Sequence, residues 1–81
     1  MTDEELIARL AGWIGEINDT APPAVTRETD LMSDLGLDSL GLAELAARVR
    51  TTYQVRLRAS EVAADLRVGA LVDLLKARLP P

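Results

Sequence analysis

The segment DLGLDSLGLAELAARVRTTY, residues 34–53, joins a glycine-containing loop to an amphipathic helix. At about 100° per residue, five side chains of this segment lie within about 80° of one another and form a face suited to a core. These side chains are Leu42, Leu45, Ala46, Val49 and Tyr53. Leu40 points almost directly away from them, so we expect it in solvent beside Ser39. The spacing predicts a helix over about 39–53 with Ser39 at its start.

A first helix is predicted before this segment, over about residues 3–18. Thr2 and Glu5 have the spacing of a capping box, and Pro22 and Pro23 prevent the helix from continuing. Its core face carries Leu6, Leu10, Trp13, Ile14 and Ile17, and the opposite face carries Gly12 and Gly15. The intervening segment, 19–38, is longer than most connections in compact domains, which indicates a functional loop.

Two more helices are predicted after residue 53. Ser60 is the expected start of a short helix over about 60–65, and Asp65 is the expected cap of a last helix over about 68–79. The core face of the last helix consists of Val68, Leu71, Val72, Leu75 and Leu79. Pro80 and Pro81 then end it.

These elements predict an all-α fold, a small four-helix bundle with three longer helices and one short helix. The long loop lies between the first and second helices, where Leu31, Met32 and Leu35 are spaced to tuck under the bundle. Since no repeat or internal linker divides the chain, residues 1–81 are expected to form a single domain.

The composition excludes most catalytic sites within the chain. Its 81 residues include neither His nor Cys, which rules out a Ser–His–Asp triad, a thiol nucleophile and a His/Cys zinc site. The net charge of −4 and the lack of a basic stripe argue against nucleic acid as a partner. No apolar run approaches the roughly 20 residues of a membrane-spanning helix, and the start MTDEEL is unlike a signal peptide. We therefore expect a cytoplasmic monomer that is not an enzyme and does not bind membranes.

Ser39 and the acidic residues near it each allow a plain structural role. A serine at a helix start is commonly only an N-cap. A metal site could be imagined among Glu28, Asp30, Asp34 and Asp38. However, a calcium-binding loop starting at Asp30 would need glycine at position 35 and glutamate at position 41, where the chain has Leu35 and Gly41. We expect solvated loop acids and no metal.

The segment DLGLDSL, residues 34–40, resembles the prosthetic-group attachment motif of acyl carrier proteins. The resemblance extends over TDLMSDLGLDSL (29–40), GLAELAARVRTTYQVRL (41–57) and SEVAADLRVGALVDLL (60–75), in the family's helix order. It implies that Ser39 carries covalent 4'-phosphopantetheine derived from coenzyme A, flanked by Asp38 and Leu40. The prosthetic group would then supply the thiol that the chain lacks.

The resemblance also implies partner enzymes that dock on the chain. They would include a phosphopantetheinyl transferase, an acyl- or aminoacyl-loading enzyme, a ketosynthase or condensation enzyme, and tailoring or transfer enzymes. The docking residues implied are Leu40, Ala43, Glu44, Ala47 and Glu61. Scattered surface apolarity is the plain alternative for Leu40, Ala43 and Ala47.

Departures from the family pattern narrow the expected pathway. Arg48 and Arg50 stand where acids are common in fatty-acid carriers, and Gly41 replaces a frequent Asp. Docking is therefore expected to depend more on apolar contact than on charge.

We expect acyl cargo for polyketide, fatty-acid or related specialised-metabolite synthesis, with a peptidyl carrier of nonribosomal peptide assembly as the alternative. A helical adaptor without a prosthetic group is a more distant one. Many arginines and one lysine, with abundant Ala and Leu, suggest a GC-rich bacterial source.

Overall fold

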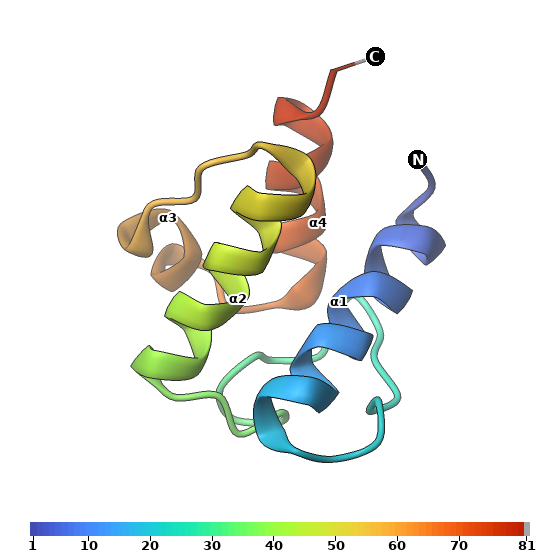
Figure 1. The fold of residues 1–81 in the computed structure, drawn as a ribbon, viewed down its shortest axis with the longest axis vertical. Helices are drawn as coiled ribbons and strands as arrows, with labels where there is room; N and C mark the ends of the chain where they lie inside the picture. Colours follow the sequence, from blue (N-terminus) through green and yellow to red (C-terminus); the bar gives the residue numbers. More distant parts are fainter. Residues whose placement is uncertain (81) are drawn as a thin grey trace.

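The computed structural model describes residues 1–80 and contains four helices. They are α1 (Asp3–Asn18), α2 (Ser39–Tyr53), α3 (Ala59–Ala64) and α4 (Val68–Arg78). Helix α1 packs against α2 and α4, and the short α3 lies beside α2 (Figure 1). The predicted all-α bundle is confirmed, because the described residues form no strand and only one isolated β-bridge, between Asp30 and Arg67.

Helix α1 begins with the predicted capping box. The Glu5 N–H donates to Thr2 Oγ1 at 3.1 Å, and the Thr2 N–H donates to Glu5 Oε1 at 3.0 Å. Gly15 differs from expectation because it is buried and not on an outer face. A Cβ there would lie 2.9 Å from the Thr20 carbonyl oxygen, so glycine lets the chain turn back tightly against the end of the helix.

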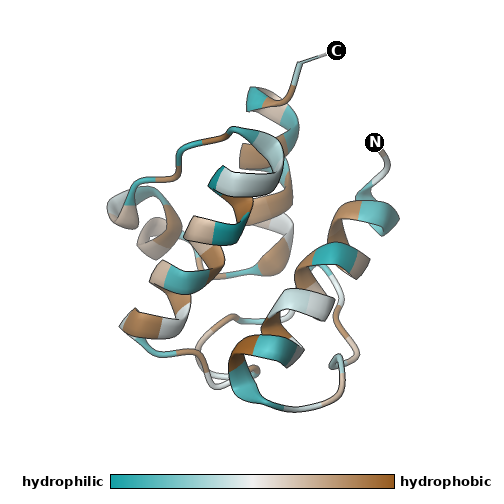
Figure 2. Cartoon of the chain, viewed as in Figure 1, coloured by the Kyte–Doolittle hydropathy of each residue, from teal (hydrophilic) through white to brown (hydrophobic). Residues whose placement is uncertain are grey.

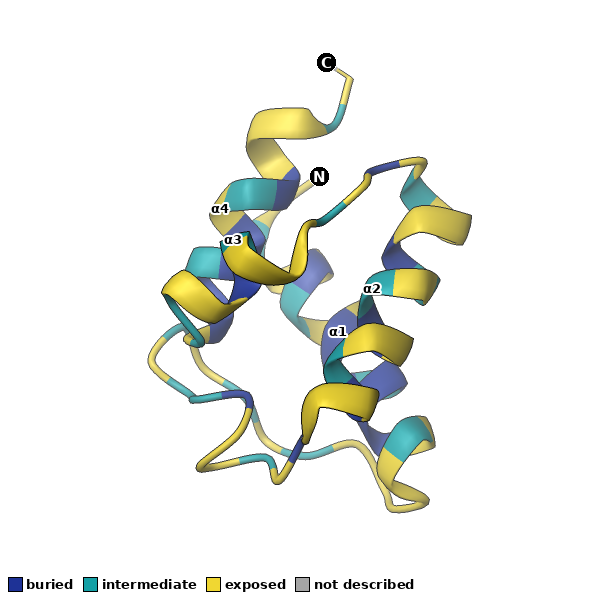
Figure 3. Ribbon diagram, turned by 90° about the vertical axis from the view of Figure 1, so that its left-hand side faces the viewer, coloured by how far each residue is buried: buried dark blue, intermediate teal, exposed yellow. Residues whose placement is uncertain are grey.

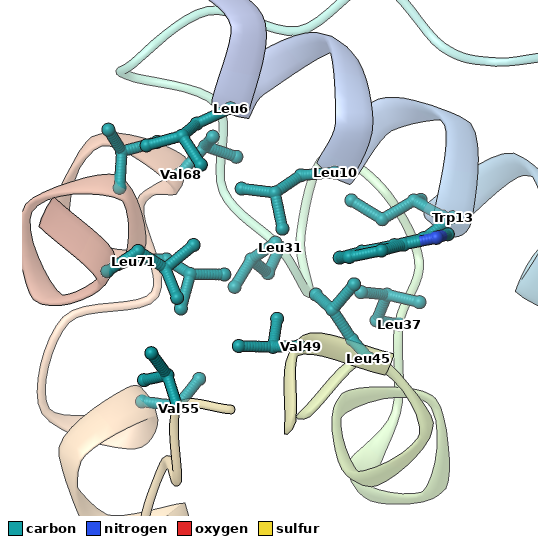
Figure 4. Packing of buried hydrophobic residues seen from close by; sticks show 14 residues of the cluster. Leu6, Leu10, Trp13, Leu31, Leu37, Leu45, Val49, Val55, Val68 and Leu71 are labelled. Carbon is teal, nitrogen blue, oxygen red and sulfur yellow. The ribbon is translucent and has the colours of Figure 1, made fainter. Parts of the chain in front are cut away.

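The core is built from all four helices, with Val62 as the contribution of α3, and from the segments that join them. Figure 4 shows side chains of α1, α2 and α4 converging with Leu31 and Leu37 of the loop and with Val55. Hydrophobic residues lie on the inward sides of the helices and hydrophilic ones on the outward sides (Figure 2), and buried positions follow the same division (Figure 3). Of the loop residues expected under the bundle, Leu31 is buried and Leu35 partly so, but Met32 is exposed. The prediction for Met32 was wrong, because the turn that starts at Asp30 directs it outward.

Backbone hydrogen bonds fasten the long loop to the start of α4. The Val68 N–H donates to the Thr29 carbonyl at 2.9 Å, and the Gly69 N–H donates to the Arg27 carbonyl at 2.8 Å. Since these loop carbonyls satisfy the first N–H groups of α4, that helix needs no side-chain cap. This corrects the expectation that Asp65 caps α4. Its carboxylate instead accepts from the backbone and guanidinium of Arg67.

The bounds of the last two helices differ by one residue from those expected. Helix α3 begins at Ala59, and its N-cap is Arg58, whose carbonyl accepts the N–H groups of Glu61 and Val62. Ser60 therefore lies inside the helix and does not start it. Helix α4 ends at Arg78, and Leu79 is its half-buried C-cap with extended backbone.

Leu45 tests the core assignment, because its side chain is 2% exposed at the centre of the bundle. We expect Leu45→Ala to lower the free energy of unfolding by about 2–5 kcal/mol, through lost burial and the cavity left behind. Leu40→Ala is the matched control, because Leu40 is 68% exposed on the same helix and should change stability by no more than about 0.5 kcal/mol. Urea denaturation followed by circular dichroism measures both. Equal losses would contradict the assigned faces of α2.

Candidate functional site

Ser39 is the first residue of α2 and lies on the surface. The N-cap is Asp38, whose Oδ1 accepts the Gly41 N–H at 2.8 Å. Capping by Asp38 is thus observed, and the alternative that Ser39 itself caps the helix is excluded. Among residues 1–80, the Ser39 hydroxyl has no hydrogen-bond partner, so the fold makes no use of it.

The backbone around Ser39 suits a phosphate ester. The N–H groups of Ser39 and Leu40 have no acceptor within the described residues, because both lie in the first turn of α2. Unpaired N–H groups and the positive end of the helix dipole favour negative charge at this point. An exposed hydroxyl at such a position fits the attachment of a phosphopantetheinyl group.

The start of α2 is held in place from below by Leu37, which is only 3% exposed. A Cβ on Gly41 would lie 3.0 Å from Leu37 Cδ2, so a larger residue at 41 would crowd this contact. The loop before it turns at Gly36, which has a φ of 71° that favours glycine. Asn18 Nδ2 donates to the Leu35 carbonyl at 2.9 Å and ties the same loop to the end of α1.

An apolar groove of about 480 Å³ begins beside Ser39 and runs between α2 and α3. Its apolar walls come from both helices and from the chain around them, and include Met32, Leu42, Ala43, Ala46, Leu57 and Val62. We call it the serine groove. Leu42 and Ala46 were expected on the core face of α2, and the sequence pattern does not predict this groove. Its α2 wall follows helical spacing from Ser39, but nothing local in the sequence indicates that α3 forms the other wall.

The outward side of α2 carries the residues expected to dock partners. Leu40, Ala43, Glu44 and Ala47 are all exposed, with Leu40 the most exposed large hydrophobic residue within residues 1–80. Arg48 does not add a free charge to this side, because its Nη1 lies 3.2 Å from Glu16 Oε2 on α1. That docking involves these residues stays a prediction.

Glu61, the remaining predicted docking residue, is engaged within the protein. Its carboxylate forms an ion pair with Arg78 and accepts the Arg58 N–H at 3.1 Å. The hydrogen bond from the Arg78 guanidinium, followed by that from the Arg58 backbone, lowers the pKa of Glu61 to about 2. Glu61 therefore joins α3 to α4. A partner that docks on Glu61 would have to preserve or replace its ion pair with Arg78.

The acids considered for a metal site organise the loop. Asp30 Oδ1 accepts the N–H groups of Met32 and Ser33, both at 2.8 Å, and Asp34 Oδ2 accepts the Asp30 N–H at 2.8 Å. The hydrogen bonds from Ser33 and Met32 lower the pKa of Asp30. Asp30 and Asp34 therefore cap turns and are more than solvated acids.

Comparison with known proteins shows the family of the chain. Residues 4–75 match the family model described as "Phosphopantetheine attachment site". The chain is 37% identical over 75 residues to the meromycolate extension acyl carrier protein of Mycolicibacterium smegmatis, covering 93% of this chain and 76% of that protein. The chain belongs to the acyl carrier protein family. It therefore functions as an acyl carrier whose prosthetic group is covalent 4'-phosphopantetheine.

Other relatives show how widely this carrier domain is used. The chain is 32% identical over 75 residues to an acyl carrier protein of Rhodococcus erythropolis, covering 93% of this chain and 82% of that protein. It is 33% identical over 78 residues to a non-reducing polyketide synthase of Penicillium rubens, covering 96% of this chain but 3% of that protein. It spans 66% of the length of the meromycolate extension acyl carrier protein of Mycobacterium leprae. Within residues 1–80 of this carrier, none of the helices is both long and apolar enough to cross a bilayer.

The lowered pKa of Glu61 predicts a pH-dependent contribution to the stability of this carrier. Because the pKa lies below its ordinary value of 4.5, the stabilisation is fully present above about pH 4.5 and is lost as the pH falls through about 2. We expect Glu61→Gln to unfold at lower urea concentration than wild type at pH 7, with the difference shrinking toward pH 2. Glu44→Gln is the control, since Glu44 forms no ion pair within the described residues. A difference that does not depend on pH would contradict this role of the Glu61–Arg78 pair.

Proposed function

We propose that Ser39 is the attachment point of the prosthetic group, and that the chain presents acyl thioesters to partner enzymes without catalysing a reaction itself. The observation that supports this most directly is the position of Ser39 at the exposed start of α2, with Asp38 already serving as cap. The serine is thereby free for modification without loss of the helix start.

Each residue near Ser39 would have a distinct part in this function. The Ser39 hydroxyl would become a phosphodiester, and the unpaired N–H groups of the first turn would stabilise its negative charge. Leu37 and Gly41 hold the helix start in position, so that a transferase meets a defined backbone. The prosthetic group, when bound, supplies a terminal thiol for thioester formation. The serine groove would give the apolar part of an acyl chain a surface on which to lie.

The partners would be a phosphopantetheinyl transferase, an acyl-loading enzyme and a ketosynthase or other condensing enzyme. Since the transferase uses coenzyme A, loading is expected in the cytoplasm. Two relatives are named for meromycolate extension and polyketide synthesis, and this favours lipid or polyketide-type assembly for the present chain. Aminoacyl cargo gains no support from these relatives, and a simple adaptor role gains none from the family match.

Loading with coenzyme A and a permissive phosphopantetheinyl transferase tests the assignment of Ser39. We expect the intact mass to rise by one phosphopantetheinyl group in wild type and to stay unchanged in Ser39→Ala. Ser33→Ala is the matched control, because Ser33 is an exposed serine of the preceding loop and should leave loading intact. A loaded Ser39→Ala variant, or wild type that several transferases fail to load, would refute the proposal.

Docking beside Ser39 is expected to depend mainly on Leu40. Burying an exposed leucine at an interface can contribute about 1.5–3 kcal/mol, whereas an exposed ion pair contributes about 0–1 kcal/mol. Leu40→Ala should therefore slow acyl transfer from a condensing enzyme more than Glu44→Ala does, at both low and high salt. Steady-state transfer kinetics with loaded protein measure the effect. Full activity of Leu40→Ala together with inactivity of Glu44→Ala would show that charge governs docking here.

A further inference from the structure

A second groove, of about 920 Å³, adjoins the serine groove and is strongly cationic. Its arginines come from three parts of the fold: Arg50 from α2, Arg56 and Arg58 from the segment that joins α2 to α3, and Arg78 from α4. The only acid among its lining residues is Glu61. We call this feature the arginine groove. The groove is positively charged, although the chain as a whole has a net charge of −4.

The charges of the arginine groove are only partly neutralised by the protein. Arg78 is committed, because it pairs with Glu61 and donates to the Arg56 carbonyl at 3.0 Å. Arg50, Arg56 and Arg58 form no ion pair with any acid among residues 1–80. Three exposed guanidinium groups without an ion-pair partner therefore line the groove together with the Glu61–Arg78 ion pair. Such a surface attracts carboxylates, which guanidinium groups bind through paired N–H donors.

The arginine groove lies along α2 from Ser39 and adjoins the serine groove. It shares Ala43, Ala46, Leu57 and Arg58 with the serine groove, so the two form one continuous surface. Arg50 lies eleven residues beyond Ser39 on α2, or about 16 Å along the helix axis. The alanines on the α2 side are small and leave room for side chains of a partner between the arginines.

We propose that the arginine groove docks an acidic surface segment of a partner enzyme. The inference rests on the proposed function, since it needs enzymes that come to Ser39. Charge complementarity selects a carboxylate-rich segment, and the lack of any aromatic side chain in the lining argues against stacking of nucleic-acid bases. The apolar contact at Leu40 then provides affinity, while the arginine groove orients the enzyme along α2.

Titration of the ¹⁵N-labelled full chain with hexaglutamate tests this inference. We expect saturable chemical-shift changes at the backbone amides of Arg50, residues 56–58 and Arg78, which weaken at high salt. Hexaglutamine should cause none. The double variant Arg50→Glu/Arg58→Glu should bind hexaglutamate about tenfold more weakly or worse, given the usual strength of exposed ion pairs. Arg9→Glu, a charge reversal at an exposed arginine of α1 outside the groove, should bind like wild type.

Each other outcome overturns the inference. Shifts spread evenly over the surface, or equal weakening by Arg9→Glu, would show only non-specific attraction. Equally tight binding of hexathymidylate would assign the groove to nucleic acid, and equally tight binding of inorganic phosphate would assign it to small anions. The spectrum of the double variant shows whether it is folded. If wild type is loaded normally but the titration fails, only the docking role of the arginine groove is refuted. If wild type is not loaded, the attachment site at Ser39 is refuted.

Discussion

The contact between Leu37 and the start of α2 is the constraint on which the site depends. Leu37 is buried in the core, yet it is followed directly by the cap Asp38 and the surface residue Ser39. Within two residues the chain therefore passes from the interior to solvent. Gly41 permits this because it leaves space for the Leu37 side chain beneath the first turn. The serine is thus fixed in position by a buried neighbour while its own side chain contributes nothing to packing.

The long loop behaves as part of the core. Leu31 and Leu37 fill space that the helices leave open, and the carbonyls of Arg27 and Thr29 complete the start of α4. Small domains bury a limited share of their surface. On folding, an 81-residue chain buries only about 60–65% of the surface that its unfolded state exposes. Packing the loop inward adds apolar burial and also holds the segment before Ser39 in one conformation.

Sequence patterns predicted the helices and their inward faces because helical period and capping are local properties. Examples of such local properties are the Thr2–Glu5 capping box and the helical spacing of Leu45, Val49 and their neighbours. Sequence patterns led to wrong predictions where contacts between distant segments determine the structure. Asp65 was not the cap of α4, because carbonyls some forty residues earlier take that role. Gly15 was placed outside because the turn that covers it was not foreseen. The motif identified Ser39, but the serine groove needs the spatial meeting of α2 and α3, and the arginine groove needs α4 as well.

Ser39 and the outer ends of α1 and α4 lie toward opposite ends of the molecule. In Figure 1 the start of α1 and the end of α4 lie toward one end of the molecule, whereas α2 starts near the other. Neither the start of α1 nor the end of α4 therefore obstructs the approach to Ser39. Matching segments occur both in a carrier protein of similar length and in a long synthase. In the polyketide synthase, the matching segment makes up 3% of the protein.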